Sequence, residues 1–131
     1  MKLHAMRLRL GTDLKNELIK FVKENNIQAA FIGTCVGCLK SAKIRLAGAK
    51  TFKELDKKLE IVSLVGTLSP DGVHVHISLA DEDGKTVGGH VQEGCIVYVT
   101  AEIIICECKD FIFSREFDTQ TNFKELKISK R

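Results

Sequence analysis

Three of the four histidines in this chain gather in one short segment: His74 and His76 in the sequence GVHVHISLA, and His90 in VGGHV. Three neutral imidazoles are the ligand set of an open tetrahedral zinc site, in which water or a substrate takes the fourth position. Imidazole also suits copper, nickel and iron, so the residues indicate a metal more firmly than they indicate which metal. The alternative is that these histidines are solvated or hydrogen-bonded residues on the polar face of a strand.

Strict alternation of apolar and polar residues from Val73 to Leu79 predicts a strand with one buried and one polar face. His74 and His76 then point to the same side, roughly 6.5–7 Å apart along the strand. The following sequence EDG fits a three-residue hairpin loop, in which Gly84 supplies the left-handed residue that such loops favour. We therefore expect a hairpin that carries all three histidines.

The predicted loop length also fixes the register of this hairpin. If Asp81 pairs with Lys85, counting back along both strands places His76 opposite His90. The apolar residues of the second strand then fall on the same face as those of the first, whereas a two-residue loop would shift the register and spoil this match. The hydrophobic pattern therefore selects the register that brings the three imidazoles together.

Composition favours one domain, which we expect to span residues 1–131, with enough chain to bury a proper core. No segment approaches the length of an apolar membrane span, and charges interrupt the start of the chain where a signal peptide needs an apolar run. We therefore expect a cytoplasmic protein without membrane partners. The five cysteines are an odd number, which argues against a disulfide framework and favours reduced thiols.

The net charge of +3 comes from the C-terminal residues 124–131, which carry four basic side chains and one acidic side chain. The remaining residues sum to zero, whereas a dedicated reader of duplex DNA usually carries a broad basic face. We interpret residues from about 127 to 131 as a solvated basic tail.

The pattern of elements predicts an α+β fold: a mainly antiparallel sheet of about seven strands with one major helix packed on it. The helix is expected within residues 11–26, capped by Thr12 or Asp13. Residues 51–57 are expected to form a short, helical connector, and residues 122–128 are expected to extend beyond the end of the fold. The strands at 59–68 and 96–106 carry apolar residues on both faces.

Glu102 lies in a very apolar strand, so it is expected to meet a cationic partner or a subunit contact. Arg115 in the next predicted strand is the candidate partner. The carboxylates that could assist a metal-dependent reaction are Glu102, Asp81 and Asp118, but their distance from the histidines does not follow from the sequence.

Several segments resemble, in order, the plant and prokaryote conserved (PPC) domain family: MRLRLGTDL, LEIVSLVGTLS, HVHISLADEDGKTVGGHV, TAEIIIC and REFDTQTNFKEL. The resemblance covers residues from about Met6 to Leu126. Its most specific part is the block of two histidines, an acidic turn and GGH; Arg7 and Gly11 add a weaker match.

The resemblance implies a compact domain that forms a homotrimer, and a metal held through His74, His76 and His90. In plants the domain follows an AT-hook and serves assembly and partner binding. The one proline of the present sequence, Pro70, is not preceded by Arg-Gly-Arg, so we expect DNA binding to be weak or absent without a partner.

Three functions remain open at this point. The first is a trimeric, zinc-binding PPC domain that acts as a binding or regulatory module with other proteins. The second is a DNA-associated transcriptional regulator. The third is a small zinc-dependent hydrolase or lyase, in which metal-bound water reacts with a substrate. Whether the chain is an enzyme is left undecided by the sequence.

Overall fold

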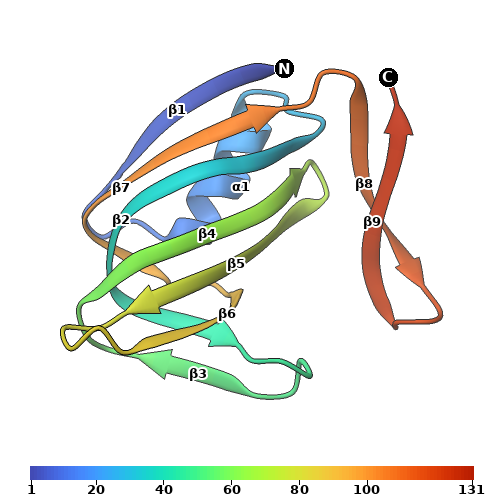
Figure 1. Cartoon of the computed structure of the whole chain (residues 1–131). Coiled ribbons are helices and arrows are strands. Elements are labelled where there is room, and N and C mark those ends of the chain that lie inside the picture. Colours follow the sequence, from blue (N-terminus) through green and yellow to red (C-terminus); the bar gives the residue numbers. More distant parts are fainter.

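The computed structural model describes residues 1–131 as a curved antiparallel sheet with one helix on one face and a separate C-terminal hairpin (Figure 1). This confirms the predicted α+β architecture with seven strands in the main sheet. The elements are β1 (Lys2–Arg9), α1 (Leu14–Glu24), β2 (Ala30–Arg45), β3 (Phe52–Leu55), β4 (Leu59–Ser69), β5 (Gly72–Ala80), β6 (Thr86–Val91), β7 (Ile96–Glu107), β8 (Phe111–Asp118) and β9 (Phe123–Lys130).

Helix α1 starts where Asp13 caps it. One carboxylate oxygen of Asp13 accepts a hydrogen bond from the Asn16 N–H at 2.9 Å, which satisfies a free donor in the first turn. The other oxygen accepts from the Gly94 N–H at 2.7 Å, so the same side chain ties the helix to the loop before β7. The helix places Leu14 and Leu18, both fully buried, in the core beside the sheet.

The long strand β2 pairs with four other strands, and through these pairings the sheet closes on itself. The main order is β1-β7-β2-β4-β5-β6, and β3 also pairs with β2. At the C-terminal end of β2, Ile44 and Arg45 pair with Val91 and His90 of β6. Strands β2, β4, β5 and β6 therefore form a closed ring of pairings, and the end of β2 lies directly beside the histidine hairpin.

The hairpin of β5 and β6 has the predicted register. Asp81 donates its N–H to the Lys85 carbonyl at 2.9 Å, and Gly84 adopts φ +79° in the loop. His76 pairs with His90 in the ladder. On the opposite face, Val75 and Val91 are each only 2% exposed, so the apolar pattern of the two strands is buried as expected.

Two segments differ from the sequence prediction. Residues 52–55 form strand β3 at the edge of the sheet rather than a helical connector, because they pair with residues 42–45 of β2. Residues 123–130 form strand β9, which pairs with β8 along its length rather than trailing off the fold. The β8–β9 hairpin stands beside the main sheet (Figure 1), which it contacts through β4 and the turn that follows β4.

No helix of this fold combines the length and apolar character needed to cross a membrane.

Candidate metal centre

Strands β5 and β6 bring His74, His76 and His90 into one cluster. One ring nitrogen from each residue lies within 4.8 Å of the other two. The Nε2 atoms of His74 and His76 are 3.2 Å apart, and the ring centroids of the three pairs are separated by 5.0, 5.0 and 5.5 Å. His76 is exposed to solvent and His90 is half-buried. The cluster therefore lies at the surface, and the side formed by His90 is partly covered by the fold.

The distance between the His74 and His76 nitrogens fits a small tetrahedral metal ion. Two nitrogens that each lie about 2.0–2.1 Å from a zinc ion at the tetrahedral angle are about 3.3 Å apart. The His74–His76 separation of 3.2 Å already has this value. His90 completes a set of three nitrogens, and such a set leaves a fourth position for another ligand.

The local electrostatics keep two of the imidazoles in the neutral form that binds metals. Burial, together with the positive charge of Arg45 and the other histidines, lowers the pKa of His90 to about 4. Burial, the neighbouring His76 and the charge of Arg115 also lower the pKa of His74. In addition, the Nδ1 atom of His90 is buried without a hydrogen-bond partner. A polar atom of this kind is unusual in a folded protein and is consistent with a site that holds an ion.

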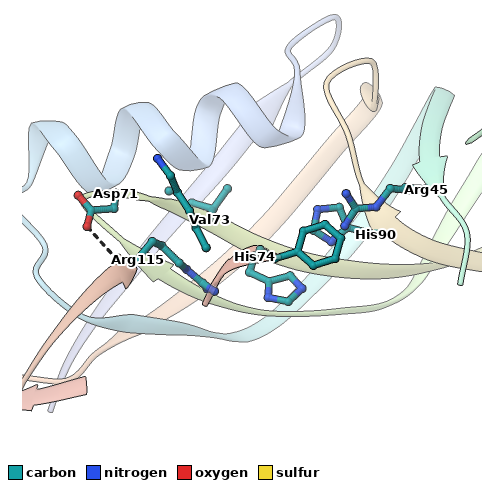
Figure 2. Close-up of a pocket in the computed structure, with 9 residues that line it drawn as sticks. Arg45, Asp71, Val73, His74, His90 and Arg115 are labelled. Atoms are coloured by element: carbon teal, nitrogen blue, oxygen red, sulfur yellow. Dashed lines mark hydrogen bonds between the residues drawn. The ribbon is translucent and has the colours of Figure 1, made fainter. Parts of the chain in front are cut away.

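Arginines flank the histidines on two sides. Arg45 is the register partner of His90, and His74 is the register partner of Thr67. The side chain of Arg115 reaches across from β8 and donates through Nη2 to Thr67 Oγ1 at 3.1 Å. Figure 2 shows His74 and His90 between Arg115 and Arg45.

The prediction that Arg115 faces Glu102 is wrong. Arg115 lies in the C-terminal hairpin, where its backbone N–H donates to Asp71 at 2.9 Å. Glu102 is instead opposite Arg7 in the pairing of β1 with β7, and both line a shallow groove on the outer face of the sheet. The error has a topological cause, since β8 leaves the main sheet instead of pairing with β7.

The proposed general acids and bases are not part of the histidine cluster. Asp81 accepts hydrogen bonds from the Lys57 side chain and from backbone N–H groups of the hairpin loop, which lowers the pKa of its carboxyl group. Asp118 accepts from the Gln120 N–H in the turn between β8 and β9. Both carboxylates therefore organise turns.

Sequence reasoning missed Arg45, Phe123 and Lys124, which line the same cavity as His74 and His90. Arg45 arrives through the long-range pairing of β2 with β6, and the other two come with β9. No local pattern in the sequence signals either placement.

The fold and the cluster together define a class of small antiparallel-sheet domain that carries three histidines on one hairpin. The family model for the Plants and Prokaryotes Conserved (PCC) domain matches residues 1–109. The chain belongs to this family, which confirms the resemblance to the PPC domain.

Known proteins agree with this assignment. A hypothetical protein from Salmonella has a similar structure, with TM-score 0.95 and 36% identity, covering 99% of this chain and 94% of its own. A metal-containing protein from Archaeoglobus fulgidus matches at TM-score 0.84 and 30% identity, covering 95% and 92%. A structure from Bacteroides thetaiotaomicron, whose name suggests DNA binding, has TM-score 0.84 over 95% and 91% of the two chains, but at 20% identity it shows the fold alone.

A curated relative, the bifunctional protein GlmU from Synechococcus, is 42% identical over 130 residues. These residues are 99% of the present chain but 21% of that protein, so the chain spans about a fifth of the length of this relative.

Proposed function

We propose that the chain is a metal-binding PPC domain, in which His74, His76 and His90 hold one divalent ion, with zinc as the first choice. The observation that carries this proposal is the convergence of three ring nitrogens, two of them 3.2 Å apart, on one rigid hairpin. The metal-containing relative from Archaeoglobus fulgidus supports it. The ion would supply a Lewis acid with an open coordination position.

We further propose that the domain acts as a homotrimeric binding or regulatory module. The outer face of the sheet supports this assembly because it exposes large apolar side chains, including Val36 at 61%, Val62 at 59% and Val65 at 56%. Exposed apolar patches of this kind usually mark interaction sites. Further copies of the same chain are the occupants that we propose for this face.

A DNA-associated role is the second candidate, and the basic residues of β9 favour it. We expect this binding to be weak, because the rest of the chain carries no net positive charge.

A zinc titration by calorimetry tests the metal proposal on protein that has first been stripped of metal. One equivalent of zinc should bind, and His76→Ala should weaken the affinity by more than about 100-fold, since even residues behind a ligand change metal affinity by 10–100-fold. The matched control is His4→Gln, because His4 is the only histidine outside the cluster and glutamine can still donate a hydrogen bond to Glu107. Equal zinc affinities for the two variants would contradict the proposal.

A further inference from the structure

A cavity of about 310 Å³ lies between the histidine cluster and the C-terminal hairpin. The main sheet contributes Arg45, His74 and His90, while β8 and β9 contribute Arg115, Phe123 and Lys124. The side chains that Figure 2 labels surround this space, with the two histidines in the middle and an arginine toward each end. The volume is at the small end of the range for small-molecule sites, so it suits a compact ligand.

The charged groups around this cavity are mostly positive. Arg45, Arg115 and Lys124 line it, and none of the three forms an ion pair with a carboxylate in this structure. One acid, Asp71, also lines it, and its Oδ2 atom accepts the Arg115 backbone N–H. A second acid, Glu125, lies close enough to His74 for its negative charge to favour the protonated imidazole. The positive side chains therefore exceed the acidic ones.

The two arginines are held in place by contacts that leave donors free. Arg115 uses Nη2 to donate to Thr67, and the guanidinium of Arg45 lies over the Phe123 ring, 5.7 Å from its centroid. Both arginine residues are half-buried. A guanidinium carries five N–H donors in a fork that matches the oxygens of a carboxylate or a phosphate. Positioned, partly desolvated donors without an anionic partner are typical of an anion-binding site.

We propose that this cavity binds a small-molecule oxyanion, a carboxylate or phosphate group held by Arg45 and Arg115. A second donor atom of the same molecule would reach the ion held by the histidines. This second contact rests on the proposed metal function, whereas the arginine contacts do not. The ligand class is therefore a compact acid that can also bind a metal, such as an acid with a neighbouring hydroxyl or carbonyl oxygen.

The C-terminal hairpin gains a role from this assignment. Without β8 and β9, the histidines would lie on an open sheet surface, because Arg115, Phe123 and Lys124 all come from this hairpin. The Arg115 N–H to Asp71 bond and the Arg115 to Thr67 bond fix the hairpin against the ends of β4 and β5. The hairpin thus turns a surface cluster into a cavity.

Calorimetric titrations with inorganic phosphate, acetate and glycolate test the inference on metal-free protein and on protein loaded with one equivalent of zinc. Arg45→Gln and Arg115→Gln should each weaken binding of phosphate or glycolate by about tenfold or more. The control Arg131→Gln removes the same charge from an exposed residue outside the cavity and should leave binding unchanged. Glycolate should bind more tightly than acetate only in the zinc-loaded protein, because its hydroxyl can ligate the ion.

The outcomes separate this inference from the metal proposal. If none of the three anions binds either form, or if the Arg45, Arg115 and Arg131 variants bind them equally, the oxyanion site is overturned while the histidine site stands. If phosphate binds through the arginines in a protein that takes up no zinc, the metal proposal fails and the oxyanion site stands. A preference for phosphate over both carboxylates would identify a phosphate ester as the ligand source, and the reverse preference a carboxylic acid.

Discussion

His76 lies directly opposite His90 in the β5–β6 ladder, and Arg45 lies beside His90 on the next strand. These three residues thus form a row across three neighbouring strands of the sheet. The row places Arg45, the proposed anion-binding side chain, beside two of the proposed metal ligands, so the register of a single hairpin decides whether the cluster and the cavity exist together.

Shortening the hairpin loop should therefore abolish metal binding. Deletion of Asp83 leaves a loop one residue shorter, so either the pairing register shifts and His90 turns to the apolar face, or the hairpin is strained. Zinc calorimetry should show loss of stoichiometric binding. Asp83→Ala keeps the loop length and is the control, so equal affinities for the deletion and the substitution would contradict the register argument.

A buried carboxylate that bonds to His4 and Lys109 should make stability depend on pH. Glu107 is 3% exposed and accepts from His4 at 2.8 Å and from Lys109 at 2.6 Å. Burial alone would raise the pKa of this carboxyl group, but the bonds from Lys109 and His4 lower it overall. Because the folded pKa lies below the unfolded value of about 4.3, the ionised form stabilises the fold above that pH. This stabilisation is lost as the pH falls through the folded pKa.

Glu107→Gln should accordingly lower the free energy of unfolding at pH 7 by about 1–3 kcal/mol. Urea denaturation at pH 7 and at pH values below 4 measures the difference from the unmodified chain, which should shrink in acid. A difference that stays constant over this range would show that the Glu107 charge does not stabilise the fold.

The proposed trimer should dissociate when a charge enters the outer face of the sheet. Val36→Lys places an ammonium group on this face without touching the core, since the Val36 side chain is exposed. Sedimentation velocity should show a shift from trimer toward monomer. Ile128→Lys is a matched control, because Ile128 is 58% exposed but lies on the C-terminal hairpin. A monomeric unmodified chain at micromolar concentration would refute the trimer.

Duplex DNA should bind weakly, with a shallow dependence on salt. If the four basic residues of 124–131 neutralised four phosphates, the slope of log affinity against log salt would be about −3.6. Because residues 123–130 form β9, truncation would damage the hairpin, so substitution is the appropriate test. Lys127→Gln with Lys130→Gln should flatten the slope by about two in a fluorescence anisotropy titration. Sequence-specific nanomolar binding that survives these changes would favour the regulator instead.

The histidine cluster could be predicted from the sequence because every constraint on it is local. The alternation around His74 and His76, the three-residue loop and Gly84 all lie within one hairpin, and the structure follows them. Arg45 and Arg115 could not be placed in the same way. One depends on the closure of β2 onto β6 and the other on where a separate hairpin docks, and both are long-range events.

The two missed strands have a related explanation. β3 is only four residues long, and three of these residues are exposed, so it lacks the apolar alternation that marks a strand. β9 is mostly exposed and carries several lysines. Both strands owe their structure to pairing with a partner strand, a contribution that composition does not reveal.

Elemental analysis of the protein purified without chelators or metal-affinity resin tests most directly whether the three histidines hold a metal ion. We expect one divalent metal per chain, with zinc foremost, and its complete loss in a His76→Ala, His90→Ala double variant that remains folded by circular dichroism. Two results would contradict a metal site at these histidines. One is a purified chain that contains no metal and takes up none from solution; the other is stoichiometric metal that persists in the double variant.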